Sequence, residues 1–191
     1  KAVSKKDDGK DNTRNSPTMF NVGYLDRLYW EGRAKTLEAN VLAAWKDQIG
    51  GKPDEVAKRL AAVPEYTAAF QTAFGEAPNE GNIVKALASF LRVLRTGDSP
   101  FDRWKAGDEK AMPDAAKKGA DLFLGKAGCI VCHVPPLFTD RTFHNVGIGY
   151  DKDVKDPDPG RGKITNNKED AGKFKTPHLR NLSARAPYFH D

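Results

Sequence analysis

The chain has 191 residues, a formal net charge of +5 and a mean hydropathy of −0.65. Its length predicts one domain, or one full domain and part of another. No stretch approaches the roughly 20 apolar residues that a membrane span needs, and no concentrated basic face suggests nucleic-acid binding. The chain opens on Lys1 instead of Met and shows no signal peptide, so we expect a processed form or a fragment.

The first half of the chain predicts helices behind a polar arm. Residues 1–14 include four lysines among the first ten and predict a flexible, mobile arm. Residues 15–33 carry aromatic side chains without periodicity, which indicates a packed but irregular segment. Apolar spacing and prolines at helix starts then predict four helices, over residues 36–49, 53–62, 64–74 and 80–95. The last helix carries one apolar stripe, formed by Ile83, Val84, Leu87, Phe90, Leu91 and Leu94.

The second half predicts one further helix and a long irregular region. Residues 96–104 are predicted to form a turn, because Gly97 and Pro100 break regular structure. Residues 113–124 predict a helix, and regular patterning disappears over residues 134–191. So long a loop-rich segment is uncommon in a compact domain, but it is expected where the chain wraps a large ligand. The sequence therefore predicts a mainly α fold with long irregular loops.

Cys129, Cys132 and His133 form the motif C-x-x-C-H. Each thiol can add to a haem vinyl group, and the adjacent imidazole can bind the iron. A redox dithiol is expected between a strand and a helix, and a zinc site needs more ligands than this chain offers around the pair. The motif predicts one covalently attached c-type haem with His133 as an axial ligand. Because such attachment happens outside the reducing cytosol, we expect a bacterial periplasm or an equivalent compartment.

The sixth ligand of the iron is open at this point. A methionine sulfur would raise the haem potential and a histidine would lower it. The candidates are Met19, Met112, His144, His178 and His190. For each of them a packing role or a structural hydrogen bond is the simpler interpretation.

Beyond this motif, a larger pattern resembles a known family. Residues 90–133, FLRVLRTGDSPFDRWKAGDEKAMPDAAKKGADLFLGKAGCIVCH, resemble the second-haem region of bacterial dihaem cytochrome c peroxidases, a family that includes the MauG-type enzymes. NSPTMFNVGYLDRLYWEGR is similar to the segment between the two haem domains. FHNVG, DPGRG and FKTPHLRNLSARAPYFHD are similar to the C-terminal signature of the family. The resemblance covers about residues 14–191.

The resemblance implies a domain organisation. After the flexible arm of residues 1–14, it implies a helical inter-domain segment at residues 15–100. Residues 101–191 would form a cytochrome-c-like haem domain, truncated at its C-terminus because the family's distal ligand of this haem lies beyond the match to His190. The family has a second C-x-x-C-H in an N-terminal domain, where the peroxide-reacting haem would lie.

The resemblance also implies roles for five residues. Trp30 matches a tryptophan between the two haems that is a proposed electron relay. Asn15, through its side chain, and Arg185 and Pro187, through their carbonyls, match ligands of an inter-domain calcium ion, a hard cation that prefers oxygen. Gln48 replaces a glutamate that is a candidate acid–base group in the peroxidases, and an amide cannot shuttle a proton.

We therefore expect electron relay to a peroxide-reducing haem as the function of the parent protein. The donor would be a small cytochrome c or cupredoxin, the substrate hydrogen peroxide, and the family allows a homodimer. This chain alone would be inactive. Two alternatives stay open: an electron-transfer cytochrome c without catalytic activity, and a MauG-like oxidase of a protein side chain.

Overall fold

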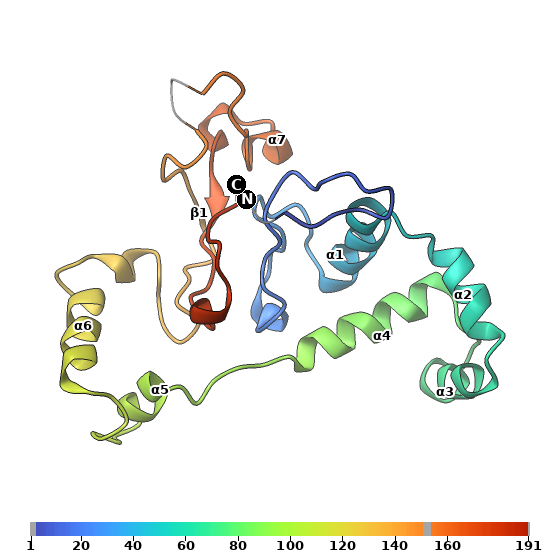
Figure 1. The fold of residues 1–191 in the computed structure, drawn as a ribbon, viewed down its shortest axis with the longest axis horizontal. Helices are drawn as coiled ribbons and strands as arrows, with labels where there is room; N and C mark the ends of the chain where they lie inside the picture. The colour runs from blue at the N-terminus through green and yellow to red at the C-terminus, as the bar shows by residue number, and fades with distance from the viewer. Residues whose placement is uncertain (1–2, 151–153, 191) are drawn as a thin grey trace. The chain divides into compact units, whose positions relative to one another are not determined.

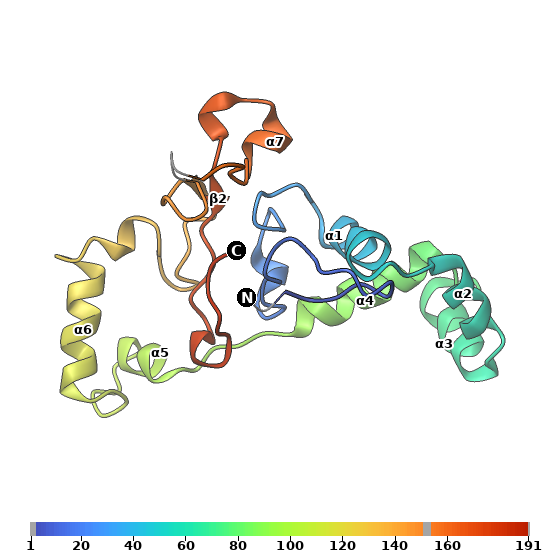
Figure 2. The same cartoon turned by 45° about the horizontal axis from the view of Figure 1, so that its top comes forward.

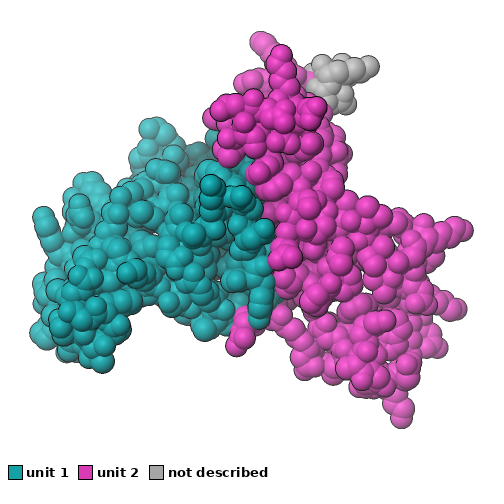
Figure 3. Space-filling model, turned by 180° about the vertical axis from the view of Figure 1, so that it is seen from behind, with its two compact units in different colours: residues 1–94, 187–191 teal, residues 95–186 magenta. Residues whose placement is uncertain are grey.

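The computed structural model describes residues 3–150 and 154–190, which are mainly helical, as predicted (Figure 1). The chain divides into two compact units, which Figure 3 shows in different colours. Unit 1 comprises Lys1–Leu94 and Pro187–Asp191, and unit 2 comprises Arg95–Ala186. Among the described residues, no helix has both the length and the apolar character of a membrane span.

Unit 1 contains the four predicted helices. They are α1 (Leu37–Ala43), α2 (Pro53–Ala61), α3 (Pro64–Phe74) and α4 (Glu80–Val93). Prolines open α2 and α3, because their fixed φ suits the first helical turn. The start of α4 has a reciprocal capping box, in which Asn79 and Asn82 each accept a hydrogen bond from the other's backbone N–H.

The predicted helix over residues 36–49 changes its winding half-way. Residues Ala44–Ile49 continue α1 as a π-helical turn instead of an α-helix. Gly50 ends this turn with φ +86°, a conformation that favours glycine. A π-turn inserts one extra residue into the winding and is often found at functional sites. It places the predicted site residue Gln48 within the widened turn.

The apolar core of unit 1 lies between α1 and α4, which contact each other and lie close together in Figures 1 and 2. Its buried members are Val22, Leu28, Tyr29, Ala34, Leu37, Val41, Val84 and Ala88. The prediction of a single stripe on α4 is wrong in part, because Leu87 is 43% exposed and Phe90 59%. α4 is buried on one side, where Ile83, Val84 and Ala88 lie, so the predicted stripe is divided between the core and the exposed surface.

Residues 3–14 of the polar arm make hydrogen bonds within unit 1. Lys5 and Asp11 form an isolated antiparallel bridge. The backbone N–H of Asp7 donates to Ile49 O at 2.7 Å, and the Asn12 amide donates to Gln48 O at 3.1 Å. The arm therefore contacts the π-helical turn, while its mobility stays a prediction.

Unit 2 contains α5 (Pro100–Lys105), α6 (Asp114–Leu124) and α7 (Gly162–Thr165). The predicted turn over residues 96–104 is wrong in part, because its second half forms α5. Pro100 stands at the start of that helix, where proline is favoured, and Ser99 and Asp102 form a capping box.

The region after residue 133 is irregular, as predicted. Its regular elements are short: α7 and the antiparallel pair β1 (Phe143–His144) and β2 (Phe174–Lys175). In this pair Phe143 lies opposite Lys175 and His144 opposite Phe174. Short 3-10 turns cover Val22–Tyr24, Cys129–Val131, Lys168–Asp170 and Leu182–Ala184.

Candidate functional site

The C-x-x-C-H motif forms a compact turn in unit 2. Cys129 opens a 3-10 helix directly after Gly128, whose φ is +70°. The backbone N–H groups of Cys132 and His133 both donate to Cys129 O, at 3.3 and 2.9 Å. Both thiols are half-buried. The turn thus presents the two sulfurs and the imidazole from one short segment, which is the arrangement that attachment to a porphyrin edge needs.

The imidazole of His133 is oriented by a backbone carbonyl. Its Nδ1 lies 2.8 Å from Phe138 O, which can only accept, so Nδ1 carries the proton. The neutral ring then has its lone pair on Nε2, the atom that can bind a metal. Metal-binding histidines commonly donate their other N–H to a carbonyl or carboxylate in this way.

The segment that carries Phe138 is itself held in place. Asp140 N–H donates to Cys132 O at 2.7 Å, and the Thr139 hydroxyl donates to Thr176 O at 2.7 Å. The Phe138 ring meets the rings of Phe101 in α5 and Phe123 in α6, with centroids 5.1 and 5.9 Å away. Phe138 has φ +59°, so these contacts hold a strained backbone that aims its carbonyl at the imidazole.

Unit 2 has the packing expected of a ligand-filled domain. Among its described residues, Phe174 is the only buried apolar side chain. Large apolar side chains of unit 2 are exposed instead, among them Leu122, Val131, Val134 and Val146. A domain of this size normally buries several such side chains. The residues present therefore fit a large, mainly apolar group such as haem.

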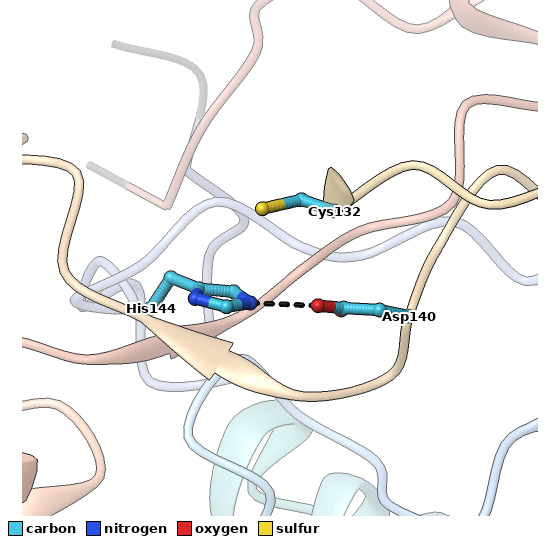
Figure 4. Close-up of side chains that lie close together, drawn as sticks. All are labelled: Cys132, Asp140 and His144. Carbon is cyan, nitrogen blue, oxygen red and sulfur yellow. Dashed lines mark hydrogen bonds and ion pairs between the residues drawn. The ribbon is translucent and has the colours of Figure 1, made fainter. Parts of the chain in front are cut away.

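Asp140 and His144 lie beside Cys132, a cluster that the sequence analysis missed (Figure 4). The ligand atoms of the three residues lie within 4.8 Å of one another. His144 Nε2 is 2.7 Å from Asp140 Oδ2, which also accepts from the Thr142 hydroxyl at 2.6 Å. Burial raises the pKa of Asp140, but these hydrogen bonds outweigh it and hold the pKa well below its usual range. The cluster has metal-ligand chemistry, yet Cys132 cannot both bind a metal as thiolate and form a thioether.

A second group of predicted residues meets in unit 1. Asn15, Trp30 and Gln48 line one small hollow of about 70 Å³. Trp30 Nε1 donates to Asn15 O at 2.7 Å, and its ring meets the His190 ring edge-on, with centroids 6.0 Å apart. The Asn15 amide donates to Pro187 O at 2.9 Å. The structure thus brings together four of the five residues that the resemblance singles out, while Arg185 belongs to unit 2.

The same hollow holds charged residues that the sequence analysis missed. Glu31 is 3% exposed and pairs with Arg14, at 2.5 Å, and with Arg33. The Arg33 guanidinium lies over the ring of Tyr29, 3.3 Å from its centroid. Burial raises the pKa of Tyr29, against the opposing effect of Arg33. A glutamate two residues before an arginine is too common in sequences to predict a buried cluster of this kind.

The candidates for the sixth ligand are spread over both units. Met19 is exposed and His190 is buried, both in unit 1. In unit 2, Met112 is half-buried, and His178 is buried with its Nδ1 accepting from Arg180 N–H at 3.3 Å. His144 uses Nε2 for Asp140. These contacts single out none of the five.

Comparisons with known proteins support the resemblance. Residues 1–110 match the family model described as di-haem cytochrome c peroxidase. Methylamine utilization protein MauG of Methylorubrum extorquens is 41% identical over 184 residues, which cover 93% of this chain and 51% of that protein. Cytochrome-c peroxidase IdrP1 of Denitromonas iodatirespirans is 35% identical over 221 residues, covering 100% of this chain and 59% of that protein.

A solved structure gives the same result. The crystal structure of a MauG-like protein associated with microbial copper homeostasis superimposes with a TM-score of 0.88 and 32% identity, covering 99% of this chain and 61% of that one. The chain therefore spans about half the length of the relatives it matches. The motifs quoted from the sequence, the family match and these identities agree, and the chain belongs to the dihaem cytochrome c peroxidase family, which includes MauG.

Proposed function

We propose that the chain carries one haem c and relays electrons from a small donor protein towards a peroxide-reducing haem. One observation carries the proposal: His133 Nδ1 hydrogen-bonds to the Phe138 carbonyl, which leaves the lone pair of Nε2 to bind iron beside the two cysteines. Cys129 and Cys132 would hold the porphyrin and His133 the iron. Bound there, the haem supplies one-electron redox chemistry, and the chain supplies its attachment and orientation.

In this proposal Trp30 is the relay residue of unit 1. Its hydrogen bond to Asn15 O and its edge contact with His190 fix the ring in one orientation. A fixed aromatic ring beside a small polar hollow suits electron transfer, since little reorganisation accompanies it. The donor would be a cytochrome c or cupredoxin, and the compartment the periplasm, where thioether attachment takes place.

Two other functions have a specific observation in their favour. Gln48 supports an electron-transfer cytochrome without catalysis, because an amide cannot transfer a proton. The 41% identity to a protein named MauG supports an oxidase of a protein side chain. Peroxide turnover by the parent protein, with a reduced small cytochrome as donor, separates both from the relay of a peroxidase.

The rate of peroxide consumption tests the assigned role. We expect this chain alone, with a reduced small cytochrome as donor, to consume hydrogen peroxide far more slowly than a dihaem peroxidase. Its haem is proposed to relay electrons, and Gln48 cannot provide the acid–base contribution of about 10²–10⁴-fold. Steady-state donor oxidation measures the rate. Fast turnover by the chain alone would contradict the relay role. A Gln48→Glu form of the parent protein that gains nothing over the unmodified parent would remove Gln48 as a cause of low activity.

We further propose that Asn15 and the carbonyl of Pro187, both in unit 1, bind calcium. Asn15 is buried, and its backbone N–H donates to His190 O at 2.9 Å. Its amide also donates to Pro187 O and Phe189 O, at 2.9 and 3.1 Å. Oxygen atoms of an amide and of backbone carbonyls are ligands that calcium prefers. Residue 15 and residues 187–190 are therefore in contact through hydrogen bonds. A bound calcium ion would take the place of some of these hydrogen bonds or add to them.

The substitution Asn15→Asp separates a calcium ligand from a hydrogen-bond donor. In chelator we expect it to lower the free energy of unfolding by about 1–3 kcal/mol, since a carboxylate then faces two carbonyl oxygens. Added calcium should restore that loss, because a carboxylate is a good calcium ligand. Asn15→Ala is the control and should be destabilised with or without calcium. Urea unfolding measures both, and an equal loss for Asn15→Asp in the two conditions would contradict the calcium site.

A further inference from the structure

The guanidinium of Arg180 is the centre of a hydrogen-bond cluster in unit 2. Its Nη1 donates to Asp102 Oδ2 at 2.5 Å and to Ser99 Oγ at 3.4 Å, and its Nη2 donates to Asp102 Oδ1 at 2.7 Å. Its Nε and Nη2 also donate to Pro136 O, at 2.9 and 2.5 Å. These contacts give an acceptor to each of the five N–H groups that a guanidinium carries. The side chain is 10% exposed, so water competes little for them.

Asp102 anchors this guanidinium to the start of α5. Its carboxylate also accepts from the backbone N–H and the hydroxyl of Ser99, at 2.9 and 2.8 Å. The Arg180 guanidinium, more than any other neighbour, holds the pKa of Asp102 well below its usual range. The carboxylate therefore stays charged, and a bidentate pair of this kind fixes direction as well as distance.

At its other end Arg180 holds the segment that orients His133. It binds the carbonyl of Pro136, and its guanidinium carbon lies 5.3 Å from the centroid of the Phe138 ring. The carbonyl of Phe138 accepts the hydrogen bond from His133 Nδ1. One side chain thus contacts both the ring of Phe138 and the backbone two residues before it. A shift of the guanidinium would move the carbonyl that sets the imidazole.

We propose that the Arg180–Asp102 pair positions the ring of His133, an inference that rests on the proposed axial role of that histidine. The pair acts through the backbone of the segment after the motif and touches neither the imidazole nor the iron. Outer partners of this kind typically change metal affinity or activity 10–100-fold when removed. Lysine cannot replace Arg180, because an ammonium has its three donors on one atom. It therefore cannot reach both the Asp102 carboxylate and the Pro136 carbonyl.

The test compares variants of the haem-loaded protein by electron paramagnetic resonance and by the midpoint potential of the haem. Arg180→Gln and Arg180→Lys should both shift the g-values of the oxidised haem and broaden its signal, without rescue by lysine. Asp102→Asn should shift the g-values in the same sense. This variant serves as the test if Arg180→Gln does not fold, because the amide oxygen of Asn can still accept from Ser99. Arg103→Gln is the matched control on α5, since Arg103 is 44% exposed and its Nη1 contacts Asp98, at 2.7 Å from the carbonyl and 3.6 Å from the carboxylate. It should change nothing.

Four results would overturn the proposal. Unchanged g-values, with potentials that move in opposite directions in Arg180→Gln and Asp102→Asn, would show that the pair acts by its charges alone. Full rescue by Arg180→Lys would show that a single positive charge suffices. Haem content, measured as pyridine haemochrome, separates the proposed function from the positioning role of the Arg180–Asp102 pair. If the unmodified protein holds no covalent haem, both proposals are wrong. Covalent haem with identical spectra in every variant refutes the positioning role alone.

Discussion

The double substitution Cys129→Ala and Cys132→Ala is expected to reduce extraction-resistant haem from one per chain to none. The two thiols are the only ones in the sequence, and a thioether to each is the covalent link we propose. His133 keeps its hydrogen bond to Phe138 O in this variant, so any haem that remains is held by ligation and packing alone. Acid–acetone extraction followed by a pyridine haemochrome assay measures the bound fraction.

A substitution inside the motif is the control. Val131 lies between the two cysteines and its side chain is 74% exposed, so Val131→Ala should retain the full haem content. Haem that leaves the unmodified chain on acid–acetone extraction would contradict covalent attachment. It would also remove the argument for an oxidising compartment, which depends on the thioether bonds.

Glu31→Ala is expected to cost about 3–5 kcal/mol of the free energy of unfolding, because it removes the buried carboxylate that two partly buried arginines contact. Glu31 is almost fully buried and pairs with both Arg14 and Arg33. The loop around it is tightly wound, with Leu28 N–H donating to Ala34 O at 3.0 Å. Because the hollow beside Trp30 is lined by the same residues, the substitution should also loosen that ring. Urea unfolding followed by circular dichroism gives the loss.

Glu38→Ala is the matched control for this prediction. Glu38 pairs with Arg92 at 2.7 Å, but both side chains are substantially exposed. An exposed pair of this kind is worth about 0.2–1 kcal/mol. If the two variants lose similar amounts of the free energy of unfolding, the burial of Glu31 does not make its ion pairs more stabilising than an exposed pair.

Much of unit 1 could be predicted because its signals are local. Prolines at the starts of α2 and α3 act within one helical turn, and the Asn79–Asn82 capping box spans three residues. The prediction of a turn over residues 96–104 was wrong in part because a local signal there has two meanings. Pro100 breaks a preceding element and also opens a helix, and only the pairing of Ser99 with Asp102 decides for the helix.

In the candidate site too, some features could be predicted from the sequence and others depend on the tertiary structure. By itself the sequence determined the motif of Cys129, Cys132 and His133 and the family, since both depend on residue identity and spacing. Only the tertiary structure decided which carbonyl faces the imidazole and which half of the α4 stripe is buried. It also decided that Arg180 pairs with Asp102, 78 residues away. The physical reason is that hydrogen-bond partners distant in the chain are chosen by the packing of the whole unit, for which no short pattern of residues carries a signal.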